Sequence, residues 1–183
     1  KCNDSYFQKL KKTLSYDKNS IIIFGGRFPL YLSNYYFDNQ EGGVEGQEYE
    51  ERYVSISKYD SIQSSFKNEV SELSRHNKII LVYPIPEAGW HVHSKLLNSL
   101  PKEDNLIKDY LVPENFISTS YEVYKNRTKL SFKLLDSIQS DNVYRVYPHT
   151  LFCNTVIKNK CVTHDDENVF YMDDDHPSNK GAE

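Results

Sequence analysis

Apolar residues recur along the chain in two alternating patterns, one spaced as in helices and one continuous as in buried strands. Spacings of three and four residues predict helices over residues 5–15, 59–76 and 118–138. Short runs of apolar residues predict strands at residues 21–24, 79–83 and 143–147. The first two runs lack polar alternation, which is typical of a strand that is covered on both faces.

The order of these elements indicates the fold class. Three helix-then-strand units in series imply parallel strands joined by right-handed crossovers. The sequence therefore predicts an α/β fold, a three-layer helix-sheet-helix sandwich around a parallel sheet. In such a sheet the functional residues gather just beyond the carboxyl ends of the strands. Those positions are residues 25–27, 84–90, the segment after residue 147, and the C-terminal segment.

Two further segments lack either pattern. Residues 39–52 contain three glycines and many carboxylates, which predicts a solvated loop that buries almost nothing rather than a phosphate-binding cradle. Prolines and a glycine interrupt residues 84–113, so we expect a long excursion that contains only one short helix, near residues 95–100.

Length and charge limit the function classes. A chain of 183 residues is sized for a single domain, and we expect one domain over residues 1–183. Its 26 acidic and 22 basic side chains form no concentrated basic face, which argues against nucleic acid as a partner. No apolar run approaches the roughly 18 to 20 residues of a membrane span. We expect any targeting signal to lie outside this sequence or to be absent.

The segment from Val169 to Glu183 carries the clearest candidate chemistry. Asp173 lies three residues before His176, so its carboxylate can fold back onto the imidazole and hold one tautomer. Ser178 is placed to cap a helix that begins at the next residue. The alternatives are a solvated acidic turn or a calcium site, although the glycine of an EF-type calcium loop is missing.

This segment resembles a known sequence block. An Asp-x-x-His pair followed by Pro-Ser and Gly-Ala is similar to the fifth block of the SGNH hydrolase superfamily, in the form found in bacterial membrane O-acyltransferases. The resemblance implies that Asp173 and His176 are the acid and base of a Ser-His-Asp triad. It also implies that Asp174 and Asp175 are flanking residues.

Residues 21–32 resemble the strand of the third SGNH block, which usually reads Gly-x-Asn. Here Gly25-Gly26-Arg27 takes that place, and the acyltransferase branch looks similar in having an arginine followed by an aromatic residue. The guanidinium of Arg27 could stabilise an oxyanion or bind a substrate oxygen. The alternative is a structural arginine in a salt bridge at the strand end.

Other residues are individually weak signals. Cys153 and Cys161 are spaced so that a loop could close them as a disulfide in an oxidising compartment, which leaves Cys2 without a partner. The alternative is three unpaired thiols. A zinc site is not indicated, because the sequence contains no Cys-x-x-Cys pair. His91 and His93 read as surface or substrate-loop residues rather than metal ligands.

The block that should supply the nucleophile is missing. SGNH domains open with a strand that ends in Gly-Asp-Ser, and a second block supplies an oxyanion glycine. Residues 3–5 imitate the first block by letter, but no apolar strand precedes Ser5. We therefore expect a partial domain that lacks its first strand and most of its last helix, and that is inactive alone.

The resemblance implies O-acyl transfer, with acetyl as the expected group, from a donor to a hydroxyl of a cell-surface glycan or lipid-linked sugar. Water as acceptor would make the protein an esterase. We expect no metal or cofactor, a membrane acyltransferase domain in the same polypeptide, and an extracytoplasmic location.

Two other classes of function remain open. One is a non-catalytic SGNH-like module that binds glycan or positions a partner domain. The other is a nucleoside- or phosphate-handling protein of flavodoxin-like topology, which would need a phosphate loop that this sequence lacks.

Overall fold

The computed structural model describes residues 9, 12–13, 18–33, 35–45, 56–103 and 106–183, with the side chains of residues 56–61 excepted. Most of the helix predicted over residues 5–15 lies outside these residues, as do Cys2 and Ser5. The other predicted elements can all be compared with the structure.

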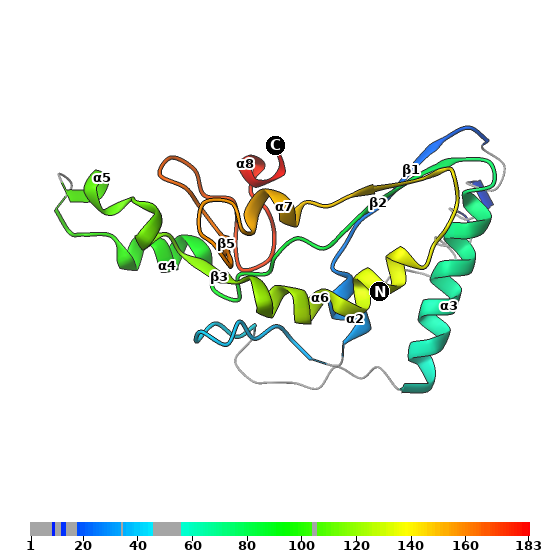
Figure 1. Cartoon of the computed structure of the whole chain (residues 1–183), viewed down its shortest axis with the longest axis horizontal. Coiled ribbons are helices and arrows are strands. Elements are labelled where there is room, and N and C mark those ends of the chain that lie inside the picture. The colour runs from blue at the N-terminus through cyan, green and yellow to red at the C-terminus, as the bar shows by residue number, and fades with distance from the viewer. Residues whose placement is uncertain (1–8, 10–11, 14–17, 34, 46–55, 104–105) are drawn as a thin grey trace.

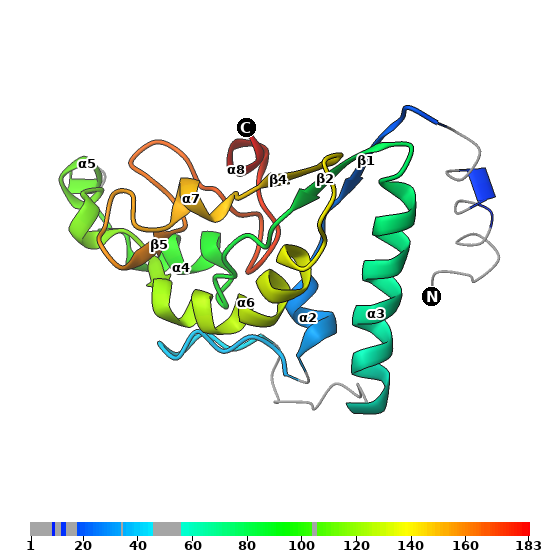
Figure 2. The ribbon, with the colours of Figure 1, turned by 45° about the vertical axis from the view of Figure 1, so that its right-hand side comes forward.

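A three-stranded parallel sheet forms the centre of the fold (Figures 1 and 2). Its strands are β1 (Ile21–Phe24), β2 (Lys78–Val82) and β4 (Val143–Val146), in the order β1-β2-β4. Both pairings are parallel, and the register places Ile22 beside Ile79 and Ile79 beside Val143. The predicted α/β class and the three predicted strands are therefore confirmed.

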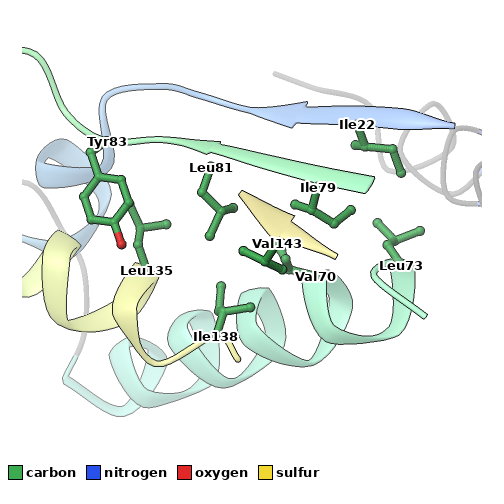
Figure 3. Packing of buried hydrophobic residues seen from close by; sticks show 9 residues of the cluster. All are labelled: Ile22, Val70, Leu73, Ile79, Leu81, Tyr83, Leu135, Ile138 and Val143. Carbon is green, nitrogen blue, oxygen red and sulfur yellow. The ribbon is translucent and has the colours of Figure 1, made fainter. Parts of the chain in front are cut away.

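One face of the sheet packs on two helices, α3 (Ile56–Leu73) and α6 (Tyr121–Asp136). Figure 3 shows the side chains of the strands and helices meeting in one cluster. Its buried members are Ile22, Val70, Leu73, Ile79, Leu81, Tyr83, Leu135, Ile138 and Val143. Burying one large aliphatic side chain contributes about 1.5–3 kcal/mol, so this cluster is the main source of stability for the sheet.

The opposite face of the sheet is open within the described residues. Ile21 and Ile23 are each 64% exposed, and Tyr144 and Val146 are 50% and 46% exposed. Alternate residues of a strand point to opposite faces, and α3 and α6 cover only one of them. The prediction that the strand at residues 21–24 is covered on both faces is therefore wrong for the described part of the chain.

A small second unit lies beside the sheet. It pairs β3 (Ser118–Ser120) with β5 (Lys160–Val162) in antiparallel register, and Cys153 is joined to Cys161 in the disulfide that the spacing predicts. The helix predicted over residues 118–138 begins later, at Tyr121, because Ser120 caps α6 by accepting a hydrogen bond from the amide of Val123.

Shorter elements connect these parts. They are α2 (Phe28–Leu32), α4 (Val92–Ser99), α5 (Ile107–Tyr110), η2 (Pro113–Asn115), α7 (His149–Phe152) and α8 (Asn179–Ala182). The excursion after β2 thus contains α5 and η2 besides its predicted helix, and α5 lies at the far end of the molecule from α3 (Figure 2). The longest described helices carry several charges, and none of the described helices qualifies as a membrane span.

The loop that begins at Asn39 is partly buried, contrary to the prediction. Asn39 is fully buried, its amide nitrogen donates to the carbonyl of Ala88, and its side-chain oxygen accepts from the backbone amides of Glu41 and Gly43, each at 2.8 Å. A Cβ on Gly43 would lie 2.3 Å from the Asn39 amide nitrogen, so glycine is required there. One asparagine thereby fastens this loop to the segment after β2, and residues 46–52 lie outside the described part.

His149 is a buried histidine in an aromatic environment. Its ring lies 5.3 Å from the ring of Tyr124 and 5.4 Å from that of Phe132, between ring centroids. Its Nδ1 atom is buried without a hydrogen-bond partner among the described residues. Burial disfavours the charged form and lowers the pKa of His149.

We expect this histidine to weaken the fold in acid. As the pH falls below about 6.5, the unfolded chain binds a proton at His149 that the folded chain resists, so the free energy of unfolding decreases. His149→Phe keeps an aromatic ring and removes the titration. Urea unfolding at pH 7.5 and pH 5 should therefore show the variant gaining stability over the wild type at the lower pH. An equal difference at both pH values would contradict this assignment.

Candidate active site

The C-terminal segment returns to the carboxyl end of the sheet, as the parallel topology predicts. The amide of Ala88, in the loop after β2, donates to the carbonyl of Asp174 at 2.7 Å. The amide of Val92, at the start of α4, donates to the carbonyl of Asp173 at 3.2 Å. These backbone bonds hold the acidic segment against the loop after β2.

Asp173 and His176 form a hydrogen-bonded pair. The Nδ1 atom of His176 lies 2.8 Å from Oδ2 of Asp173. The other carboxylate oxygen of Asp173 accepts from the amides of Asp175 and His176, at 3.0 and 2.8 Å. The carboxylate is thus fixed by its own turn, and the spacing of three residues brings the carboxylate and the imidazole together, as the sequence predicts. The imidazole side chain is 66% exposed.

The electrostatics of the pair favour a charged carboxylate and a basic imidazole. Partial burial raises the pKa of Asp173, but the two backbone amides and the imidazole outweigh it and lower the pKa to about 2. The hydrogen bond to Asp173 raises the pKa of His176 above its ordinary value, and the charge of Asp175 adds to this effect. An imidazole in this state is a stronger base than a free histidine.

Asp175 is more than a flanking residue. Its side chain is only 9% exposed, and Oδ1 lies 3.0 Å from Nδ1 of His176. Its Oδ2 atom lies 2.9 Å from Nε of Arg27. Burial raises the pKa of Asp175, and the positive charge of Arg27 opposes this rise. The carboxylate therefore lies between the arginine after β1 and the histidine.

Arg27 is surrounded by carboxylates. Its two terminal nitrogens lie 2.7 Å from the two oxygens of Glu45, and its Nε donates to Glu87 at 2.7 Å. Burial lowers the pKa of Arg27, but the hydrogen bonds that it donates to Glu45 and the charges of Glu87 and Asp175 more than offset this and raise it. This geometry is the one expected of the salt-bridged alternative for Arg27.

Glu87 connects Arg27 to a second arginine, Arg127, whose place in the site is not apparent from the sequence. The Glu87 side chain is only 5% exposed, and its Oε2 accepts from Nε of Arg127 at 2.8 Å. Arg127, on α6, also donates to the carbonyl of Tyr35 at 2.7 Å. The two arginines and three carboxylates, Arg27, Arg127, Glu45, Glu87 and Asp175, are called the ion network below.

A cavity of about 340 Å³ lies beside the pair and the network. Its lining combines six apolar residues with the polar ones, namely Pro29, Val82, Tyr83, Pro84, Ile85 and Pro177 with Gly26, Arg27, Glu87, Asp175 and His176. The structure thus brings His176 and two of the three residues predicted after β1 to one cavity. Gly25 and Asp173 do not line the cavity. Gly25 lies next to Val82, and Asp173 contacts the imidazole through Nδ1.

Three side chains of the site lie close together, but the hydrogen bond between Asp173 and His176 already uses the atoms that a metal ion would need. One group of possible metal-ligand atoms occurs among the described residues. It comprises Asp173, Asp175 and His176, whose ligand atoms lie within 4.8 Å of one another. A cation on Nδ1 of His176 would displace the hydrogen bond to Asp173. His91 has a different role, since its ring nitrogen accepts from the amide of Ser94 and caps α4.

The described residues supply no serine in contact with His176. The nearest serine in sequence, Ser178, donates to the carbonyl of Val169 at 2.6 Å and accepts from the amide of Gly181 at 3.1 Å. It caps α8, as the sequence predicts. The hydrogen bonds of His176 to described residues use Nδ1 and the backbone, so Nε2 is left to face other groups.

Comparison with known proteins gives one match. A family model described as SGNH domain (fused to AT3 domains) matches residues 1–183. Neither a curated protein nor a solved structure matches the chain. The match covers both sequence blocks on which the resemblance was based, residues 21–32 and residues 169–183.

Proposed function

The chain belongs to the SGNH domain family that occurs fused to AT3 domains, and on this basis we propose that it supplies the acid and base of an O-acyl transfer site. The family is of a general esterase and acyltransferase type. The observation that carries the proposal is the 2.8 Å hydrogen bond between Asp173 and Nδ1 of His176, at the border of a cavity. With Nδ1 held, Nε2 is the nitrogen that is free to exchange a proton with a substrate or nucleophile.

The proposed reaction has two halves. A serine attacks the acyl carbonyl while Nε2 of His176 takes its proton, and the same nitrogen then protonates the departing alcohol or carrier. An acceptor hydroxyl next gives its proton to Nε2 and attacks the acyl-serine, and Nε2 passes that proton to the serine oxygen as the serine is released. Asp173 holds the reactive tautomer and stabilises the imidazolium in both halves. We infer that the serine comes from a Gly-Asp-Ser segment that this sequence does not contain.

The acceptor is proposed to be a hydroxyl of a cell-surface glycan or lipid-linked sugar, and the group to be acetyl. Two observations support this setting. Fusion to AT3 domains is a property of the family, which suggests a membrane acyltransferase domain in the same polypeptide. The disulfide between Cys153 and Cys161 suits an oxidising, extracytoplasmic compartment. Transfer to water would give the matching esterase reaction.

Asp173→Asn in the full polypeptide tests the proposal. We expect kcat/KM for a p-nitrophenyl ester to fall on the order of 10²–10³-fold, because an amide cannot hold the reactive tautomer or stabilise the imidazolium. In the wild type the rate should rise with pH through a midpoint above 6.5, because His176 must be neutral to act as base and its pKa is raised. The variant should have a lower midpoint.

Asp174→Asn is the matched control, because Asp174 contributes its backbone carbonyl to the site and makes no side-chain hydrogen bond among the described residues. We expect that variant to retain wild-type rates. Equal losses in the two variants would count against a specific role for Asp173.

A further inference from the structure

We propose that Asp175 is a second positioning residue for the imidazole of His176, and that Arg27 acts through Asp175 rather than by contacting an oxyanion. This inference rests on the proposed function and adds to it a connection between the site and the rest of the fold. It changes the roles of two residues, one that the sequence treats as flanking and one that it offers as an oxyanion donor.

Asp175 lies between the imidazole of His176 and the guanidinium of Arg27. Its two oxygens face different partners, with Oδ1 at 3.0 Å from Nδ1 of His176 and Oδ2 at 2.9 Å from Nε of Arg27. Asp173 comes from the same four-residue turn as His176 and is 37% exposed, so it orients the ring only relative to that turn. Asp175 is nearly buried and connects the ring to the turn after β1.

Two glutamates hold the guanidinium of Arg27 in one orientation. Glu45 takes both terminal nitrogens, and Glu87 lies 2.7 Å from Nε and 2.5 Å from Nη2. Glu87 is itself held by Arg127. Because these contacts fix the guanidinium in direction, Arg27 can hold Asp175 in one place. A carboxylate held in this way resists rotation of the imidazole about its side-chain bonds.

The positive charge of Arg27 is already neutralised by neighbouring carboxylates. An effective oxyanion donor is aimed at the place where negative charge develops and is not already neutralised there. The guanidinium of Arg27 faces three carboxylates, so its positive charge is more than balanced before any substrate arrives. Its remaining effect on the reaction is the one that Asp175 transmits to His176.

Charged groups reach the imidazole from two parts of the chain. Asp173 and Asp175 come from its own turn, with Asp174 close by, and Arg27 comes from the turn after β1. Asp175→Asn removes one negative charge beside the ring while keeping its shape. That change should move the titration of His176 to lower pH, whatever the reaction.

The test is a double-mutant cycle in the full polypeptide with Asp175→Asn and Arg27→Lys. Lysine keeps the charge of Arg27 and loses the fork that contacts several carboxylates at once. We expect each single variant to lower kcat about 10- to 100-fold with little change in KM, as for a misplaced catalytic group. In the Asp175→Asn background, Arg27→Lys should cost less than about 3-fold more, because the two residues act in one chain. Losses that multiply would overturn the assignment and return Arg27 to a direct role.

A second measurement is independent of catalysis. Diethyl pyrocarbonate modifies neutral imidazole, and mass spectrometry of the peptide that carries His176 gives the pH midpoint of its modification. We expect the midpoint to fall in Asp175→Asn and to fall clearly less in the control Asp174→Asn, whose side chain makes no contact with the ring among the described residues. If the wild type transfers no acyl group but the midpoint still falls, the proposed function fails while the contact of Asp175 with His176 stands. An unchanged midpoint in Asp175→Asn would overturn the inference even in an active enzyme.

Discussion

Replacing His176 with alanine is expected to lower acyl transfer by the full polypeptide by about 10⁴-fold or more. Without the imidazole, the described carboxylates that line the cavity, Glu87 and Asp175, are paired with arginines and poorly suited to take the proton of a serine and return it to the leaving group. The side chain of His176 is 66% exposed, so removing it leaves no buried cavity. The free energy of unfolding should therefore change by less than about 0.5 kcal/mol. Hydrolysis of a nitrophenyl ester and thermal unfolding measure the two effects separately.

His93→Ala is the matched control for this experiment. His93 is exposed on α4 and lies outside the cavity that His176 borders. Its removal should leave both activity and stability close to those of the wild type. Activity retained in His176→Ala at more than about a tenth of the wild-type rate would remove the proposed pair from the reaction, because general acid-base catalysis alone typically contributes 10²–10⁴-fold.

The sequence predicts the part of the site that depends on neighbouring residues. Asp173 and His176 meet because three residues of one turn separate them, and Ser178 starts the next helix by the same local rule. The strand positions follow from equally local apolar runs, and their parallel order follows from the intervening helices. These inferences need no knowledge of how distant segments pack.

The ion network could not be predicted, because its contacts join residues that are 18 (Arg27 and Glu45) to 148 (Arg27 and Asp175) positions apart in the sequence. Glu45 lies in a Gly- and Glu-rich segment that reads as solvated, and nothing in its local sequence indicates that it meets Arg27. Arg127 lies on a helix whose apolar face is its obvious feature, yet it reaches Glu87 and Ser33 on other elements. The contact of Asn39 could not be predicted either, since only the fold shows that its side-chain amide donates to the carbonyl of Ala88 and not to water.

The open face of the sheet illustrates a different limit. The apolar runs at residues 21–24 and 143–146 identify strands correctly, because β-branched and aromatic residues suit the pleated backbone. The same runs say nothing about which segment covers each face. Ile23 and Tyr144 point away from the helices that bury Ile22 and Val143. Whether a face of the sheet is covered therefore depends on where other segments pack, which a strand's own sequence does not reveal.

Glu87→Gln is expected to destabilise the fold by about 3–5 kcal/mol, because it removes the one carboxylate that contacts both Arg27 and Arg127. Glutamine keeps the shape of the side chain but cannot neutralise either guanidinium, and its amide nitrogen would face a like donor. Urea unfolding can be followed through the fluorescence of Trp90, the single tryptophan, three residues away in the sequence. Such a loss is a large fraction of the 5–15 kcal/mol that typically stabilises a domain.

Glu41→Gln provides the matched comparison, since Glu41 pairs with Lys160 at 2.6 Å and both side chains are 34% exposed. Solvent screens this pair, so its loss should cost no more than about 1 kcal/mol and should shrink further in high salt. The loss from Glu87→Gln should persist in salt, because the charges left behind are shielded from ions by the surrounding protein. Equal and salt-sensitive losses in the two variants would mean that the ion network is open to solvent, and that Arg27 is free to serve a substrate after all.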